Sequence, residues 1–121
     1  MDRSTINRRI QRNPEFFKAD FPEWVDLNWS IFREFCTRTH RQISAGRTKY
    51  SARTIIEVMV HDSFLSDSQG EYKIGNDRAP DMARAFVLAY PEHVDFWEYR
   101  RPDWREFKAH VNGFTPYALA A

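Results

Sequence analysis

The clearest pattern in the chain is a run of apolar residues at helical spacing between residues 24 and 43. Their spacing is that of one face of an α-helix, and the run consists of Trp24, Leu27, Ile31, Phe32, Phe35, Cys36 and Ile43. Asp20-Phe21-Pro22 is a helix start signal before the run, and Gly46 fits the C′ position that ends a helix. The pattern predicts one long amphipathic helix between these two signals.

Shorter helices are predicted on both sides of the long one, over about residues 14–20, 52–64, 78–90 and 103–112. Their boundaries carry residue types that favour helix ends. Asn13-Pro14 is typical of a cap followed by proline at the first helical position, and Ser51 is placed to cap the second helix. Pro91 ends the third helix, because proline cannot continue the hydrogen-bond pattern. Four alanines in that third helix favour close packing against its neighbours.

Two short segments have the composition of β-strands. Residues 71–74 alternate polar and apolar side chains, and residues 95–99 are rich in aromatic residues. We expect these segments to pair as a ribbon, with Lys49-Tyr50 extended or in a very short strand. The predicted fold class is therefore mainly α with a small β ribbon, in a single domain.

The length of 121 residues suits one compact domain, and an aromatic content of 16% rules out a disordered chain. Residues 1–12 are polar and basic, so we expect a flexible arm there, then a helical domain over residues 13–113 and a tail over residues 114–121. No apolar run approaches the roughly 20 residues that span a bilayer. The start of the chain lacks the apolar stretch of a secretory signal, which predicts a cytoplasmic protein without a membrane partner.

The formal net charge of +1 conceals a strong asymmetry along the chain. Residues 1–53 have a charge balance of +5, and residues 54–77 have a balance of −4. No acid lies between Glu34 and Glu57, whereas five cations do: Arg38, Arg41, Arg47, Lys49 and Arg53. The helix dipole favours cations near a helix C-terminus, which is a structural explanation for the first two. A run of five cations without an acid also attracts a polyanion, because binding depends on local potential.

Four motifs follow one another in the second half of the chain: YSxRTIxE from Tyr50 to Glu57, GEYKI from Gly70 to Ile74, APxxAR from Ala79 to Arg84, and PEHxxFWExR from Pro91 to Arg100. The stretch over residues 49–100 that holds them resembles a family of small uncharacterised proteins common in bacteriophages and prophages. The chain departs from that family's pattern at Gly75-Asn76-Asp77 and at Asp81-Met82. The resemblance implies a phage or prophage setting and assigns no particular chemistry.

Catalytic and metal chemistry has little support in the residue pattern. Glu57 and His61 share one predicted helix face, but the second histidine of a zinc-protease motif is absent. Cys36 falls on the apolar side of the long helix, so we expect a buried thiol. Glu71-Tyr72-Lys73 supplies only the E-x-K half of a nuclease pattern. We therefore expect a binding protein and not an enzyme, without metal or cofactor, and with a nuclease as the open alternative.

The order of the predicted elements resembles a winged helix-turn-helix, in which the helix over residues 78–90 would enter the major groove. The predicted DNA-binding residues are Arg38, Arg41, Arg47, Lys49, Arg53, Asn76, Arg78, Arg84, Arg100 and Arg101. We expect Asn76, Arg78 and Arg84 to face bases and the flanking cations to contact phosphates. A structural alternative is that Arg78 and Arg84 pair locally with Asp77 and Asp81. The leading hypothesis is a small phage-type DNA-binding protein with an accessory or regulatory role.

A protein–protein interaction module is the alternative hypothesis. Tryptophan, tyrosine and arginine dominate the anchors of protein interfaces, and five large aromatic residues are candidates: Trp24, Trp29, Trp97, Trp104 and Tyr117. Most of them are expected to fill the core, but Trp29 lies off the main apolar stripe of its helix. The partner would be a host enzyme or a component of phage assembly. A homodimer is compatible with both hypotheses.

Overall fold

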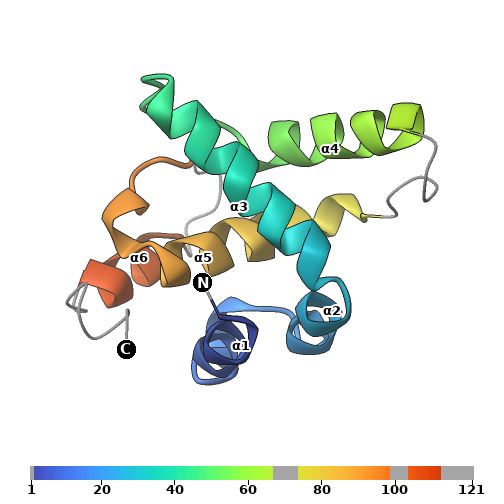
Figure 1. The fold of residues 1–121 in the computed structure, drawn as a ribbon. Helices are drawn as coiled ribbons and strands as arrows, with labels where there is room; N and C mark the ends of the chain where they lie inside the picture. Colours follow the sequence, from blue (N-terminus) through green and yellow to red (C-terminus); the bar gives the residue numbers. More distant parts are fainter. Residues whose placement is uncertain (1, 67–73, 99–103, 113–121) are drawn as a thin grey trace.

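The computed structural model describes residues 2–66, 74–98 and 104–112. Within these ranges the chain forms six α-helices and three short 3₁₀ turns (Figure 1). The helices are α1 (Arg3–Gln11), α2 (Phe21–Leu27), α3 (Trp29–Ser44), α4 (Ala52–Ser66), α5 (Ala79–Ala89) and α6 (Trp104–Asn112). The turns are η1 (Pro14–Phe16), η2 (Asn76–Arg78) and η3 (Pro91–His93). The helical prediction for the chain is confirmed.

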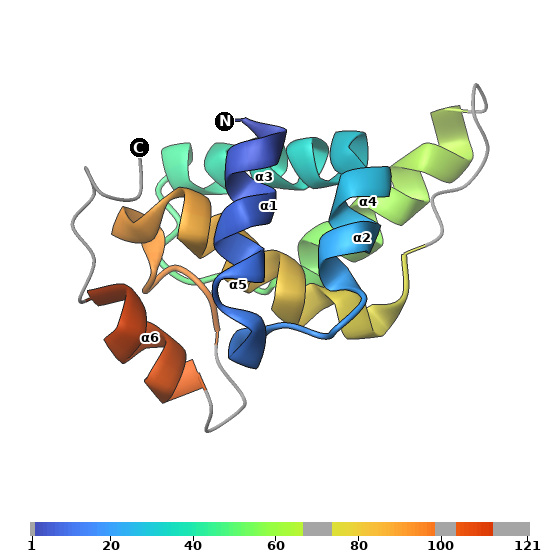
Figure 2. The same ribbon diagram turned by 90° about the horizontal axis from the view of Figure 1, so that it is seen from below.

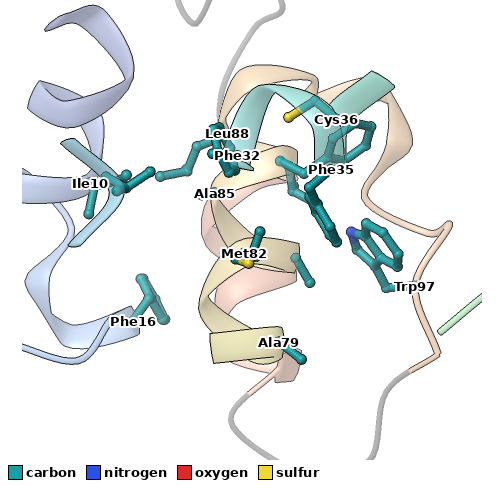
Figure 3. Close-up of a cluster of buried hydrophobic side chains, with 14 of the residues drawn as sticks. Ile10, Phe16, Phe32, Phe35, Cys36, Ala79, Met82, Ala85, Leu88 and Trp97 are labelled. Carbon is teal, nitrogen blue, oxygen red and sulfur yellow. The ribbon is translucent and has the colours of Figure 1, made fainter. Parts of the chain in front are cut away.

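Helix α5 forms the centre of the molecule. It lies between α1 on one side and the pair α3 and α4 on the other, and α6 lies beyond its end (Figures 1 and 2). Every residue from Asp81 to Leu88 is buried. The alanines at 79, 83 and 85 are buried as well, and their small side chains allow neighbouring elements to approach closely. Figure 3 shows the apolar side chains that pack around this helix.

The predicted long helix is wrong in one respect, because two helices occupy its place. The helical conformation is interrupted at Asn28, whose φ of −117° and ψ of 38° lie outside the helical region. The Asn28 side chain donates a hydrogen bond to the carbonyl of Trp24 at 2.9 Å, which satisfies the end of α2. Asparagine competes for backbone groups in this way more readily than apolar residues do. The apolar spacing continues across the break, and the sequence pattern therefore conceals it.

The end of α3 confirms the role predicted for Gly46, which has a φ of 94°. The amide of Gly46 donates to the carbonyl of Ile43 at 3.0 Å, and the amide of Arg47 donates to the carbonyl of Gln42 at 3.2 Å. These two bonds are those of a Schellman motif, which needs a residue with positive φ at C′. The predicted cap of α4 is also present, since the Ser51 hydroxyl accepts from the amide of Thr54 at 3.4 Å.

The N-terminal segment differs from the flexible arm expected for residues 1–12. Residues 3–11 form α1, and the Asp2 carboxylate caps this helix by accepting from the Thr5 amide at 3.0 Å. Hydrogen bonds from the Thr5 and Ser4 hydroxyls lower the pKa of Asp2 to about 2. Ile6 and Ile10 are buried against the rest of the protein. By contrast, the helix predicted over residues 14–20 is reduced to the single turn η1.

The predicted small β ribbon is wrong. The described residues contain no strand, and their only bridge joins Tyr50 to Trp97 in parallel. Tyr50 donates to the carbonyl of Phe96 and accepts from the amide of Glu98, both at 3.0 Å. The amide of Phe96 in turn donates to the carbonyl of His93, so the aromatic segment follows a turn and is too short to form a strand. Residues 71–73 of the proposed partner strand lie outside the described ranges.

Candidate nucleic-acid interface

The winged-helix arrangement is wrong, because the helix assigned to the DNA groove is the core of the protein. A recognition helix must present a solvent-facing surface to the base edges, whereas α5 is buried from Asp81 to Leu88. Arg84 was predicted to face bases, but it is only 6% exposed. Its Nη1 donates to the carbonyl of Phe16 at 2.6 Å, and its guanidinium lies over the rings of Trp104 and Phe107. Arg84 is therefore a structural residue.

Arg78, the second predicted base contact, is held by α2. Its guanidinium forms two hydrogen bonds with the Asp20 carboxylate, at 3.0 and 2.7 Å, and lies 5.2 Å from the centre of the Trp24 ring. The hydrogen bond from Arg78 lowers the pKa of Asp20. Arg78 therefore does not form the hydrogen-bonded pair with Asp77 that the structural alternative predicted. Asp77 instead accepts a hydrogen bond from Lys18 at 2.6 Å. Arg78 therefore joins distant parts of the chain.

Two cations of the acid-free segment are neutralised by acids from outside it. Arg38 lies 2.8 Å from Asp62 on α4 and 3.8 Å from Glu34 on its own helix. Arg53 donates to Glu57 at 3.1 Å, one turn further along α4. Both pairs reduce the positive potential that a polyanion would meet. The remaining predicted positions Arg100 and Arg101 and the side chain of Asn76 lie outside the described part of the structure.

The other predicted cations, Arg41, Arg47 and Lys49, are exposed at the end of α3 and in the loop that follows. Arg41 lines a shallow groove of about 320 Å³ on the outer face of α3, together with Ser30, Arg33, Glu34, Thr37 and Arg38. Arg47 lies over the Tyr50 ring, 4.8 Å from its centre. The structure therefore places exposed basic side chains along the outer face of α3 and in the loop that follows it.

Arg33 also belongs to this basic surface, although the sequence pattern did not indicate it as a candidate binding residue. It precedes Glu34 and therefore falls outside the acid-free stretch from which the site was predicted. The signal that could have found it is the spacing of Arg33, Thr37 and Arg41, which places all three on one helix face. We define the basic strip as Arg33, Thr37, Arg41, Arg47 and Lys49. Over residues 33–62 the chain has six Lys and Arg against three Asp and Glu, so the surrounding surface keeps a positive balance.

The residues that the structure describes form neither a recognisable metal site nor an activated nucleophile. No group of three or more histidine, cysteine or acidic side chains there has a geometry suited to a metal ion. Burial raises the pKa of the Cys36 thiol, which is 3% exposed and therefore unsuited to act as a thiolate. Glu71 and Lys73, which raised the nuclease alternative, lie outside the described residues. No helix within the described ranges is long and apolar enough to cross a membrane.

The aromatic candidates for a protein interface are mostly used inside the fold. Trp97 and Trp104 are buried, and Trp24 stacks on Phe21 with ring centres 5.9 Å apart. Trp29 is half-buried and contacts Phe32 at 5.6 Å. Tyr117 lies outside the described residues. Leu27 is different, because it is 74% exposed at the corner between α2 and α3.

Comparisons of the chain with protein-family models, with curated proteins and with solved structures found no match. The resemblance to a phage protein family therefore stays a prediction from its four motifs. Several residues of those motifs are buried in the described structure, including Ala79, Ala83, Arg84, Phe96 and Trp97. Packing is thus a sufficient reason for these residue types at these positions.

Proposed function

We propose that the protein binds DNA through the basic strip on α3 and the α3–α4 loop. The observation that carries the proposal is the exposure of Arg33 and Arg41 on one groove of α3, next to a loop with Arg47 and Lys49. Eight residues separate the two groove arginines, which corresponds to about 12 Å along the helix. That distance is close to the width of the major groove of B-DNA, about 12 Å, so the two guanidinium groups can contact phosphates on opposite sides.

The proposed mode is phosphate contact without base reading. Arginine and threonine are common donors to phosphate oxygens, and such contacts position a protein without conveying sequence information. Helix α5, the only helix assigned to base recognition, is buried and takes no part. An accessory or regulatory role on DNA, in the cytoplasm of a phage-infected host, fits this mode and the resemblance of residues 49–100.

The triple substitution Arg33→Ala, Arg41→Ala and Arg47→Ala is expected to weaken DNA binding at least tenfold at low salt. Each lost phosphate contact reduces the dependence of affinity on salt by about one unit of log–log slope, so we expect a total reduction of roughly 3. Fluorescence anisotropy with duplex and single-stranded DNA over a series of salt concentrations measures both quantities. The folded state is expected to persist, because all three side chains are exposed.

The matched control is the triple variant Arg8→Ala, Arg12→Ala and Arg105→Ala. It removes the same charge from exposed positions on α1, at the C-terminal end of α1 and on α6. Figure 1 shows α1 on the opposite side of α5 from α3. This control is expected to keep most of the affinity and nearly all of the salt slope. Equal losses in the two variants would show that net charge alone governs binding. Absence of wild-type binding to any DNA at low salt would disprove the proposal.

A protein–protein interaction through the α2–α3 corner is the second candidate, and the exposure of Leu27 favours it. Among the described residues, the large apolar side chains that are exposed are Leu27, at 74%, and Val58, at 43%. Trp24, one turn before Leu27, and Trp29, two residues after it, are partly buried and pack against the core. Tryptophan is the residue type that dominates interface anchors, and here two tryptophans lie close in sequence to an exposed leucine. A host enzyme or a phage assembly component would be the partner.

Leu27→Ser is expected to reduce the affinity for such a partner at least tenfold, since loss of an anchor residue costs about 2 kcal/mol or more. The measurement is cross-linked capture from host lysate, followed by titration of the captured protein with wild type and variant. Val58→Ser is the control, because Val58 is also exposed but lies on α4. Unchanged affinity in Leu27→Ser would refute this candidate, and unchanged DNA binding in the same variant separates it from the first.

A further inference from the structure

Two histidines from distant parts of the chain meet at the junction of α3 and η3. The ring of His40 on α3 lies with its centre 5.8 Å from that of His93 in η3, and the two rings are nearly perpendicular. Aromatic rings surround the pair. His40 lies 4.5 Å from Tyr90 and 5.2 Å from Phe86, measured between ring centres. An imidazole packed against aromatic rings loses hydration, which penalises its charged form.

Residues 90–98, which include His93, contribute the buried aromatic side chains of Phe96 and Trp97 to the core. The amide of Phe96 donates to the carbonyl of His93 at 3.0 Å, and Trp97 is 1% exposed. Tyr50 joins this segment through its two backbone hydrogen bonds to Phe96 and Glu98. The contact between His40 and His93 is therefore adjacent to the only bridge between the α3–α4 loop and residues 90–98 in the described structure.

We propose that the His40–His93 contact is an acid-sensitive latch that holds residues 90–98 and the Tyr50 bridge against α3. The two imidazole rings pack face to edge beside Phe86 and Tyr90. On acidification His40 gains a proton, and its positive charge then lies within a partly buried aromatic cluster. The cost of desolvating this charge favours separation of η3 from α3. The latch is independent of the DNA-binding proposal.

The charged groups around the pair set the direction of the effect. Burial lowers the pKa of His40, His93 lowers it further, and Glu92 opposes them. Glu92 Oε1 lies 3.9 Å from His93 Nε2 and is 53% exposed, so solvent screens its compensation. Tyr90 and Cys36 also face this cluster, and burial raises the pKa of each, which keeps both neutral at neutral pH.

The sign of the pH dependence follows from linkage. The folded-state pKa of His40 is below its value in the unfolded chain, so the open and unfolded states bind more protons at acidic pH. The closed contact is therefore fully stable above the ordinary histidine pKa of about 6.5. Stability is lost as the pH falls below that value toward the lowered pKa of His40.

Amide hydrogen exchange of Tyr50 and Glu98 tests the latch, because their amides form the bridge. After correction for intrinsic rates, protection of both amides is expected to fall severalfold between about pH 7.5 and pH 5, because protonation of His40 favours the open state. His40→Phe keeps a ring in the aromatic cluster but does not titrate, so its protection is expected to stay constant over the same range. The amide of Asn28, which donates to Trp24 at 2.9 Å far from the latch, is the internal control.

Two outcomes would overturn the latch: constant protection in the wild type, or the same loss in His40→Phe as in the wild type. If His40→Phe does not fold, His40→Leu provides the same test, because it also replaces the titrating ring with an apolar side chain. His61→Gln removes an exposed histidine from α4 and is expected to leave the wild-type loss unchanged. Equal losses at Tyr50, Glu98 and Asn28 would indicate global acid unfolding and would also contradict a local latch.

Discussion

Replacing Trp97 with alanine is expected to lower the free energy of unfolding by about 3 to 5 kcal/mol, the usual cost of removing a buried aromatic side chain. Trp97 is 1% exposed and contacts rings from two helices. Its ring stacks on Phe35 of α3, with ring centres 5.6 Å apart (Figure 3). It also meets Phe86 of α5 edge-on, with ring centres 5.7 Å apart. Alanine at this position would leave a cavity where α3, α5 and the Tyr50 bridge meet.

Urea unfolding followed by circular dichroism measures this loss, and thermal unfolding should show a Tm lower by roughly 10–20 °C. Trp97→Phe is the conservative control and is expected to cost clearly less. Phenylalanine fills much of the same space, and it removes an indole Nε1 that has no hydrogen-bond partner among the described residues. A loss below about 1 kcal/mol in Trp97→Ala would contradict the central packing role assigned to this ring.

The sequence predicted the elements whose signals are local. Gly46 could be identified as a helix end because a positive φ at C′ favours glycine over every other residue. Ser51 was identified as a cap for a similar reason, since its hydroxyl satisfies an amide three residues away. Helix α5 was recognised by its alanines and by Pro91. In each case the decisive interaction involves residues that are close in sequence.

The features that sequence reasoning missed depend on distant contacts. Ile6 and Ile10 are the only buried apolar side chains of α1, which is too few for a convincing amphipathic pattern. Their helix is stable because α5 and α2 cover them, and Arg9 adds a hydrogen bond to the carbonyl of Leu88 at 3.1 Å. Tyr50 forms a parallel β-bridge with Trp97, which is distant in sequence, and not a pairing with a neighbouring segment. No propensity or periodicity within one segment encodes such pairings.

The cations of the candidate site depend on distant contacts for the same physical reason. The absence of acids between Glu34 and Glu57 marked a stretch in which Arg41, Arg47 and Lys49 are exposed, and DNA binding by these residues stays a prediction. It did not indicate that acids outside the segment reach back into it, as Asp62 reaches Arg38. Charge balance along a chain therefore identifies a basic region but not which of its cations are available to a ligand.

Arg84→Ala is expected to lower the free energy of unfolding by about 1 to 3 kcal/mol, the usual cost of leaving a buried hydrogen-bond acceptor without its donor. The side chain joins three parts of the chain, because it extends from α5, donates to the carbonyl of Phe16 in η1 at 2.6 Å, and packs on Trp104 of α6. Its loss would leave that buried carbonyl without this donor. Urea unfolding at neutral pH gives the size of the effect.

Arg84→Lys separates the contribution of charge from that of the planar guanidinium. Lysine keeps the positive charge, but it cannot reproduce the flat contact with Trp104 and Phe107. We therefore expect Arg84→Lys to recover part of the lost stability. DNA titration of the folded fraction discriminates between the two roles considered for this residue. A structural Arg84 predicts reduced stability with unchanged affinity, whereas reduced affinity at full stability would restore the base-contacting role that its burial argues against.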